Sequence, residues 1–238
     1  MNILSKIAVI TGASSGLGAA ISKVLIENGA TVYGLGRKAD KLQNLKKELG
    51  TSFIPVPLDI SDFQKVKEWV GKAFSITHSP DILINNAGVG SFAPIDEMDQ
   101  KTWYQMVNVN LNGLYYITSE IVKLMKPKIS STHIINIGSI LGSLGRVDGT
   151  AYCATKFGVQ GFSDALFKEL RVFNIKVTCI NPGSIDTSFF KSSGIDAHSN
   201  MLQAKDLAHT VLHVLQTPDN MLINEMTIRP LNPKQPKN

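Results

Sequence analysis

A glycine-rich turn near the N-terminus constrains this chain more than any other feature. The sequence Thr-Gly-Ala-Ser-Ser-Gly-Leu-Gly at residues 11–18 follows an apolar run at 7–10 and precedes apolar residues at helical spacing. A strand, a glycine turn and a helix in this order form a phosphate site, because glycine lets the backbone approach a ligand and the helix N-terminus presents free N–H groups. The spacing G-x-x-x-G-x-G differs from the usual dinucleotide fingerprint G-x-G-x-x-G, so a plain tight connection is the alternative.

Strand-like and helix-like segments alternate along the whole chain. Apolar, β-branched runs predict strands at 6–11, 31–35, 53–58, 81–85, 133–138, 176–181 and 222–228. Helical spacing predicts helices at 17–28, 39–49, 62–76, 101–125, 151–172 and 205–216. This alternation predicts an α/β fold, namely a single doubly wound, Rossmann-like domain whose parallel seven-stranded sheet has helices on both faces.

Two further expectations concern the edge of this sheet and the end of the chain. Pro55 and Pro57 cannot donate to a sheet ladder, so the third strand should be an edge strand, as in the strand order 3-2-1-4-5-6. The domain is expected to cover residues 1–230, and the polar, Pro-rich residues 231–238 are expected to form a disordered tail.

Composition excludes several classes of protein. The 238 residues carry a net charge of +5, but the basic residues are scattered, which argues against a nucleic-acid partner. No apolar run reaches the roughly 20 residues that a membrane span needs, and the N-terminus lacks the pattern of a signal peptide, so we expect a cytoplasmic protein. Cys153 and Cys179 are too few for a disulfide framework and should be reduced and buried.

Three polar residues in the second half of the chain indicate acid–base chemistry. Tyr152 and Lys156 are four residues apart on a predicted helix and therefore face the same way. A nearby ammonium lowers the pKa of a phenol, which lets the pair exchange a proton with an alcohol or carbonyl oxygen. Alone, the pair would be an ordinary feature of a helix surface, but Ser139 ends a strand-like run and places a hydroxyl at the ligand crevice.

Together these positions resemble the short-chain dehydrogenase/reductase family in its compact form. The resemblance spans residues 6–230. The motifs that carry it occur in the family's order and spacing: T-G-x-x-x-G-x-G at 11–18, Asp59, N-N-A-G at 85–88, Asn110, Ser139, Y-x-x-x-K at 152–156 and P-G-x-x-x-T at 182–187. The family's reaction is direct hydride transfer between a nicotinamide cofactor and a carbonyl or alcohol, so no metal is expected.

The resemblance also implies roles for individual residues. Tyr152 becomes the general acid in reduction and the base in oxidation, and Ser139 binds the substrate oxygen. Lys156 lowers the pKa of Tyr152 and binds the nicotinamide ribose, while Asn110 holds a water that relays protons. For Asn110 the alternative is a polar residue that kinks its helix, and the nearby Asn108 does not match the family's position.

The same resemblance implies a set of cofactor-binding residues. Asp59 and Ile60 are expected at the adenine ring, residues 86–88 near the adenosine, and residues 182–187 at the nicotinamide end. For Asp59 the alternative is a helix cap, with Ser61 as its rival. The full expected set is Gly12, Ser14, Ser15, Gly16, Leu17, Gly18, Arg37, Lys38, Asp59, Ile60, Asn86, Ala87, Gly88, Tyr152, Lys156, Pro182, Gly183, Ile185 and Thr187.

The end of the second strand favours NADP(H) over NAD(H). NAD-dependent sites place an acidic residue there to bind the ribose hydroxyls, whereas this chain has Gly36. Arg37 follows, and its planar guanidinium suits a 2′-phosphate, to which Ser14 or Ser15 can add a hydroxyl. An Arg37 that only faces solvent is the alternative.

The leading interpretation is an NADPH-dependent carbonyl reductase acting on a ketone, an aldehyde or a 3-oxoacyl group. The residues expected around the substrate are Gly90, Ser91, Phe92, Leu141, Arg146, Val147 and the loop 188–203, which is either a lid or an ordinary surface loop. A 3-oxoacyl-[acyl-carrier-protein] reductase is one alternative, although the C-terminal run 223–230 lacks that group's Gly-rich ending. A non-catalytic NADPH-binding sensor is the alternative of another class.

Two helical features complete the sequence analysis. His209 and His213 are four residues apart, but the chain lacks the accompanying Glu and a third ligand, so no metal site is predicted. The predicted helices 101–125 and 151–172 carry apolar residues on more than one face. We therefore expect a homo-oligomer, either a tetramer or a dimer.

Overall fold

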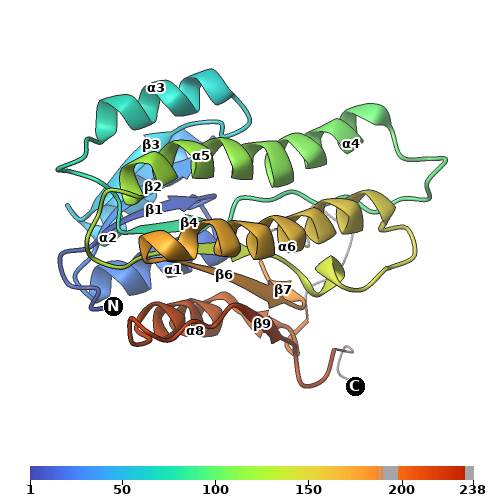
Figure 1. Cartoon of the computed structure of the whole chain (residues 1–238). Coiled ribbons are helices and arrows are strands. Elements are labelled where there is room, and N and C mark those ends of the chain that lie inside the picture. Colours follow the sequence, from blue (N-terminus) through green and yellow to red (C-terminus); the bar gives the residue numbers. More distant parts are fainter. Residues whose placement is uncertain (188, 190–197, 234–238) are drawn as a thin grey trace.

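Seven parallel strands form the central sheet of the protein. The computed structural model describes residues 1–187, 189 and 198–233. The strands are β1 (Ile7–Thr11), β2 (Thr31–Gly36), β3 (Phe53–Pro57), β4 (Ile82–Asn85), β5 (Thr132–Ile137), β6 (Ile175–Pro182) and β9 (Glu225–Ile228), in the order β3-β2-β1-β4-β5-β6-β9. All neighbouring pairs are parallel. The predicted doubly wound sheet is confirmed, and β3 with its two prolines is at an edge (Figure 1).

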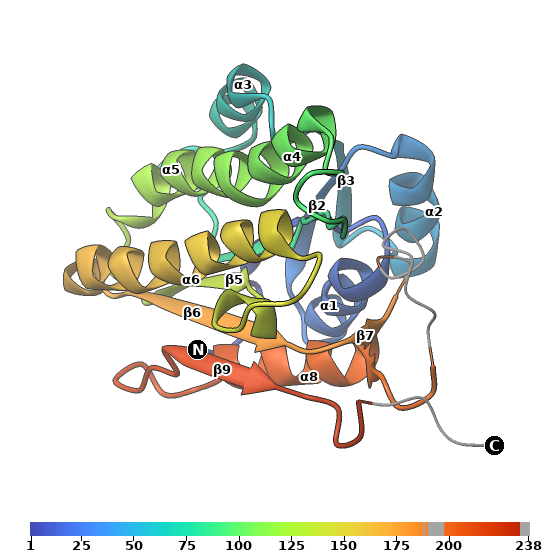
Figure 2. The same cartoon turned by 90° about the vertical axis from the view of Figure 1, so that its right-hand side faces the viewer.

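Helices cover both faces of this sheet, as Figures 1 and 2 show. One face carries α1 (Gly16–Glu27), α2 (Ala39–Leu49) and α8 (Ala204–Leu215), and the other carries α3 (Phe63–Ala73), α5 (Leu114–Met125) and α6 (Thr150–Leu170). Successive side chains of a strand point to opposite faces, so each strand contributes to both cores. Ala8 and Ile10 of β1 pack in the core with α1 and α8, whereas Val9 packs with α3 and α5.

The predicted helix 101–125 is broken in the structure. It consists of α4 (Gln100–Val107), a π-helical turn η1 (Asn108–Gly113) and α5. Hydrophobic spacing does not distinguish one wide turn from the α-helix around it, so the sequence could not predict the interruption. The turn carries Asn110, whose side chain bonds to the backbone of Val89.

Other local differences are small. The 3₁₀ helix η2 (Ile140–Gly142) follows β5, and η3 (Arg171–Phe173) ends the predicted helix 151–172. A two-stranded sheet of β7 (Ile185–Asp186) and β8 (Leu202–Gln203) was not predicted. The N-cap of α3 is Asp62, whose side chain accepts from the Lys65 N–H, so the alternative reading of Asp59 or Ser61 as that cap is wrong.

Two predicted segments lie partly outside the described residues. Of the expected lid 188–203, residues 188 and 190–197 lie outside the description, and of the expected tail 231–238, residues 234–238 do. Within the described ranges, no helix has the length and apolar character needed to cross a membrane.

A buried histidine lies in the middle of the sheet. His133 on β5 is paired in register with Ile82 of β4 and Lys176 of β6. Its Nε2 lies 2.8 Å from the Thr178 hydroxyl, which donates to the Ile223 carbonyl and must therefore accept from the imidazole. Burial, with a smaller contribution from Lys176, lowers the pKa of His133 to about 3.

This pKa predicts a specific loss of stability in acid. The unfolded chain binds a proton at a histidine pKa of about 6.5, whereas folded His133 does not, so stability is complete above that pH and falls below it. Between pH 7 and pH 5 the free energy of unfolding should drop by about 2 kcal/mol through this residue. Urea denaturation at both pH values should show a smaller drop for His133→Gln, which keeps an N–H donor.

The matched control is His213→Gln, because His213 is exposed on α8. This variant should keep the pH dependence of the wild-type protein. Equal pH dependence in wild type and His133→Gln would contradict the assignment.

Candidate active site

The glycine turn joins β1 to α1 at the C-terminal edge of the sheet. Gly12 and Gly16 have φ values of 67° and 56°, which favour glycine, so the turn could not be built with ordinary side chains. A Cβ at Gly18 would overlap the Gly12 carbonyl oxygen and lie 2.6 Å from the Asn86 side-chain nitrogen. Ser15 is the N-cap of α1, whose first N–H groups therefore face this turn. The result is the cradle expected for a phosphate group.

A second loop fixes the shape of this turn. The Thr11 hydroxyl accepts hydrogen bonds from the backbone N–H groups of Asn86 and Ala87, both at 3.0 Å. In return, the Asn86 side chain donates to the carbonyls of Thr11 and Gly12 at 3.0 and 3.2 Å. Of the predicted residues 86–88, Asn86 and Ala87 thus contact the glycine turn and hold it to the end of β4.

Two of the residues expected at the adenosine end line a common cleft. Arg37 is exposed after β2 and, together with Asp59, lines a cleft of about 720 Å³ against α4. A Cβ at Gly36 would lie 3.2 Å from the Ser14 hydroxyl oxygen, so an acidic side chain at this position would face Ser14. Lys38 is likewise exposed.

Two of the predicted cofactor residues have side chains that pack in the hydrophobic core. Leu17 of α1 packs in the core on the α1 and α8 face of the sheet, and Ile60 packs in the core on the α3 and α5 face. Ile60 also lies against η1, since its Cγ1 would be 2.8 Å from a Cβ at Gly113. Only the backbone of Leu17 therefore faces the cradle.

Ser139, Tyr152 and Lys156 come together as the sequence predicted. Ser139 follows the end of β5, and its side chain interacts with that of Tyr152 of α6. Lys156 lies one turn further along α6, where its Nζ donates to the Ile137 carbonyl at 2.9 Å. The Lys156 Nζ is 5.8 Å from the centre of the Tyr152 ring. Tyr152 is 7% exposed and Lys156 is 6% exposed.

Burial dominates the electrostatics of this cluster. It raises the pKa of Tyr152 well above its ordinary value, and the interaction with the Ser139 hydroxyl offsets only part of that rise. Burial also lowers the pKa of Lys156 to about 8. The expected lowering of the Tyr152 pKa by Lys156 stays a prediction; in this structure the Lys156 Nζ donates to the Ile137 backbone carbonyl.

Asn110 lies beside this cluster on the π-helical turn. Its side-chain oxygen accepts from the Val89 N–H at 2.9 Å, and its nitrogen donates to the Val89 carbonyl and to the Thr155 hydroxyl. A Cβ at Gly88 would lie 3.5 Å from the Asn110 oxygen and 3.8 Å from the Lys156 Nζ. Asn108, by contrast, is exposed and bonded to Asn112.

The segment after β6 returns to the glycine turn. Gly183 donates its N–H to the Ile228 carbonyl at 2.7 Å, which ties the end of β6 to β9. Thr187 lies next to the glycine turn, because its side chain would be 3.3 Å from a Cβ at Gly16. Pro182, Gly183, Ile185 and Thr187 therefore run along the same edge as the cradle.

Aromatic side chains lie next to the ring of Tyr152. The rings of Phe92 and Phe189 have their centres 5.5 and 5.9 Å from that of Tyr152. A Cβ at Gly90 would lie 3.2 Å from the Tyr152 ring, and Leu141 packs in the same cluster.

Arg146 and Val147, also expected around the substrate, differ in placement. The Arg146 guanidinium stacks on Phe92 at 4.3 Å and is thereby linked to this aromatic cluster. Val147 is 83% exposed and lies outside the cluster.

The histidines and cysteines have other environments. His209 and His213 are exposed on α8, and nowhere in residues 1–187, 189 and 198–233 do three potential metal-ligating side chains gather. Cys153 and Cys179 are both free and buried, as expected.

Sequence reasoning missed several residues that shape the site. Thr155 binds Asn110, and Asn181 binds the backbone N–H of Ser139 at 3.2 Å. Asn181 precedes the Pro-Gly pair directly, but a lone Asn in a strand carries no signal of its own. Its contacts are visible only in the folded chain.

The sequence matches one protein family over most of its length. Residues 6–197 match the family described as short chain dehydrogenase. The chain belongs to the short-chain dehydrogenase family. It is 37% identical over 233 residues to an uncharacterized oxidoreductase of Staphylococcus aureus strain MRSA252, covering 97% of this chain and 100% of that protein.

Solved structures of other short-chain dehydrogenases have the same fold. A closed form of serine dehydrogenase complexed with NADP+ superposes with a TM-score of 0.87 at 30% identity, covering 93% of this chain and 94% of the other. A 3-ketoacyl-(acyl-carrier-protein) reductase from Brucella melitensis complexed with NADH has a TM-score of 0.88 at 26% identity, covering 96% and 98%. The protein is thus an oxidoreductase of this family.

Proposed function

We propose that this short-chain dehydrogenase reduces a carbonyl group with NADPH and that Tyr152 donates the proton. The observation that carries the proposal is the buried contact between Ser139 and Tyr152 beside Lys156. The raised pKa of Tyr152 keeps its hydroxyl protonated at neutral pH, which is the state that a proton donor needs in reduction.

The other side chains support this step. Bound NADPH would supply the hydride. The Ser139 hydroxyl can donate to the substrate oxygen and stabilise the negative charge that develops there, and the surrounding hydrophobic side chains exclude water. Lys156 and Asn110 would bind the ribose and a relay water, since both lie beside Gly88. In oxidation, Tyr152 would accept the proton and the rate would rise with pH.

For the cofactor, we infer a preference for NADP(H). Arg37 and Lys38 place two exposed cations after β2, and Gly36 leaves the position of the ribose-binding acid without a carboxylate. A guanidinium binds a phosphate through two parallel hydrogen bonds. The glycine cradle would hold the pyrophosphate, with residues 182–187 at the nicotinamide end.

For the substrate, we propose a ketone, an aldehyde or a 3-oxoacyl compound bound among Gly90, Leu141 and Arg146. Phe92 and Phe189 make the surroundings of Tyr152 aromatic, while Arg146 adds a positive charge at its margin. Serine, the substrate named for one relative, carries a carboxylate, and Arg146 suits such a group. A 3-oxoacyl carrier-protein reductase is the second candidate, because one structural relative bears that name.

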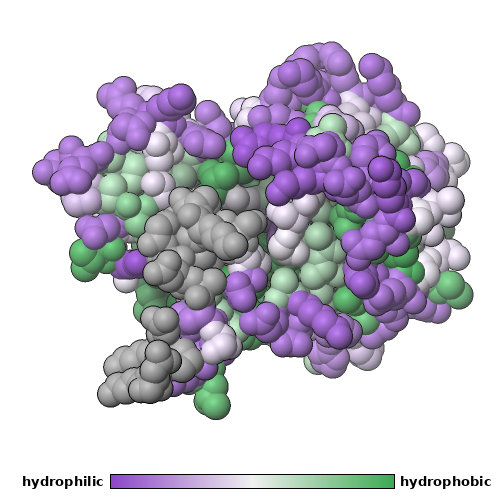
Figure 3. Space-filling model, turned by 180° about the vertical axis from the view of Figure 1, so that it is seen from behind, coloured by the Kyte–Doolittle hydropathy of each residue, from purple (hydrophilic) through white to green (hydrophobic). Residues whose placement is uncertain are grey.

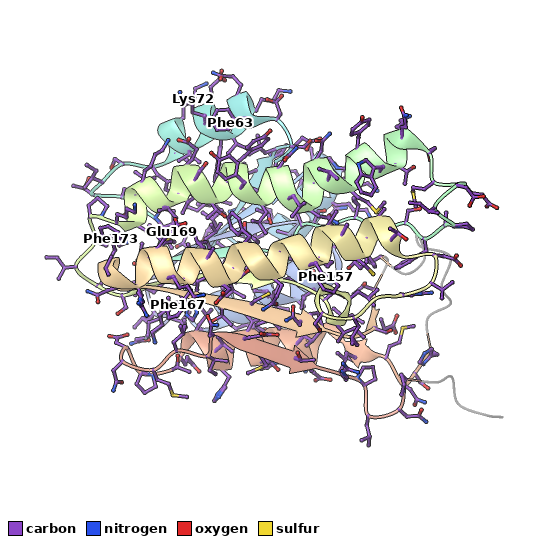
Figure 4. The ribbon with its side chains drawn as sticks, turned by 45° about the vertical axis from the view of Figure 1, so that its right-hand side comes forward. Phe63, Lys72, Phe157, Phe167, Glu169 and Phe173 are labelled. Carbon is purple, nitrogen blue, oxygen red and sulfur yellow. The ribbon has the colours of Figure 1, made fainter. Side chains whose placement is uncertain are left out.

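We also propose a homo-oligomer that forms through α5 and α6. The two helices border a groove of about 280 Å³ lined by residues such as Tyr115, Phe162 and Ala165. Phe157 is 48% exposed on α6, and Figure 4 shows it on the same side of the molecule as Phe167 and Phe173. The back of the molecule as drawn in Figure 1, seen in Figure 3, is covered largely by hydrophilic side chains with hydrophobic areas between them.

Gly161 supports this assignment of the interface. It is exposed in the middle of α6, and a Cβ there would meet nothing within 4 Å. Glycine costs a helix about 1 kcal/mol relative to alanine, and no contact among the described residues requires it. Close approach of a helix from a second copy would require a glycine at this position.

We place this oligomer in the cytoplasm, with residues 1–230 as its domain.

The first test is Tyr152→Phe, assayed by NADPH oxidation on a panel of ketones, aldehydes and 3-oxo esters. Loss of the proton donor should lower kcat by about 10²- to 10⁴-fold, while NADPH binding measured by fluorescence persists. Tyr33→Phe, which removes a surface hydroxyl that within the described residues is hydrogen-bonded only with His78, should leave turnover unchanged. Wild-type turnover in Tyr152→Phe would refute the mechanism, and NADPH binding without turnover on any compound would favour a sensor.

The second test concerns the cofactor. Arg37→Glu should lower kcat/KM for NADPH by about 10- to 100-fold, because a charge-assisted hydrogen bond is replaced by repulsion of the 2′-phosphate. The value for NADH should change little. Lys47→Glu makes the same charge change on exposed α2 and should affect neither cofactor. Equal losses of kcat/KM with NADPH and NADH would show that Arg37 does not bind the 2′-phosphate.

The third test concerns assembly. Gly161→Glu would place a carboxylate on the outer face of α6, and light scattering after size exclusion should give a lower mass than for wild type. Gly71→Glu is the matched control, since Gly71 is also exposed on a helix with open space around it. A wild-type mass for Gly161→Glu, or a monomeric wild-type protein, contradicts the proposed interface.

A further inference from the structure

Asn181 connects the end of β6 to the backbone of Ser139. The residue is 2% exposed, and its side-chain oxygen accepts the Ser139 N–H at 3.2 Å. Ser139 lies beyond the last residue of β5, Ile137, so the Asn181 side chain supplies an acceptor that the strand no longer provides. The Cys179 thiol donates to the same oxygen at 3.4 Å.

The other end of the Asn181 carboxamide is held by two acceptors. Its nitrogen donates to the side-chain oxygens of Gln160 on α6 at 2.8 Å and of Glu225 on β9 at 3.0 Å. An ionised carboxylate only accepts hydrogen bonds, so Glu225 requires the nitrogen on its side. A flipped amide would set two donors against each other at Ser139 and an oxygen against the carboxylate. The orientation of Asn181 is therefore fixed by its partners.

Space for this side chain comes from the residue before Ser139. A Cβ at Gly138 would overlap the Asn181 oxygen. Gly138 itself continues the pairing with β6 through a 2.8 Å bond from its N–H to the Ile180 carbonyl. The approach of Asn181 to Ser139 thus depends on the absence of a side chain at 138.

Ser139 is also held on its other side. Its hydroxyl oxygen accepts the Leu141 N–H at 3.1 Å, and the same hydroxyl interacts with the side chain of Tyr152. With the N–H held by Asn181, the direction of the Ser139 side chain toward Tyr152 is determined from both sides of its Cα.

We infer that Asn181 is a positioning residue that acts through Ser139, an inference that rests on the proposed role of Ser139 in the reaction. Within the described part of the chain, Asn181 forms no hydrogen bond to Tyr152 or Lys156. Its hydrogen bonds tie the position of Ser139 to those of Gln160 on α6 and Glu225 on β9. Small displacements of a hydrogen-bond donor near a reacting atom are costly, so loss of Asn181 should lower kcat rather than cofactor affinity.

A double-mutant cycle tests this inference. Asn181→Ala should lower kcat by about 10- to 100-fold, with little change in KM for NADPH. In a Ser139→Ala background the same substitution should lower kcat by less than about twofold, because the serine it positions is gone. Asn220→Ala, in an exposed turn, is the matched control and should change neither parameter. Multiplicative losses in the double variant would overturn the inference.

A second measurement does not depend on turnover. Amide hydrogen exchange at Ser139 should accelerate in Asn181→Ala and stay at the wild-type rate in Asn220→Ala. If Asn181→Ala does not fold, the pair Gln160→Ala and Glu225→Ala, at half-buried and exposed positions, should accelerate the same exchange. Unchanged exchange overturns the inference even if the proposed reaction is right, and accelerated exchange supports it even if no substrate is reduced.

Discussion

The parallel strands end together at one edge of the sheet, and the backbone groups beyond them need new hydrogen-bond partners. A buried N–H without a partner costs about 1–3 kcal/mol. Thr11 accepts the N–H groups that follow β4, Asn110 holds the backbone of Val89, and Asn181 holds that of Ser139. The side chains that close off the sheet are thus the same ones that shape the site.

Burial sets the chemistry of the cluster at this edge. Tyr152 and Lys156 are removed from water, which disfavours the charged form of each, so the tyrosine keeps its proton and the lysine loses its proton more readily. Charge that develops on a substrate in such surroundings interacts strongly with fixed dipoles, because little water screens it. The same desolvation that opposes a phenolate therefore favours reduction by a protonated Tyr152.

Much of this architecture could be predicted from local sequence, and the exceptions have physical causes. Pro55 and Pro57 cannot donate to a neighbour, and β3 is accordingly an edge strand. The π-helical turn around Asn110 was missed because its hydrophobic spacing resembles that of an α-helix. The cap of α3 fell on Asp62 rather than on Asp59, whose carboxylate instead accepts from the Ser61 N–H. The alternative caps of α3 differ by single hydrogen bonds.

The sequence by itself determined the order of elements, the glycine cradle and the convergence of Ser139, Tyr152 and Lys156, because periodicity and strand ends are local properties. Only the tertiary structure decided the pKa of Tyr152, since desolvation depends on every residue packed around the ring. It also decided the role of Asn181, whose partners come from β5, α6 and β9. A hydrogen bond between distant segments leaves no periodic trace in the chain, and it exists only after the sheet has formed.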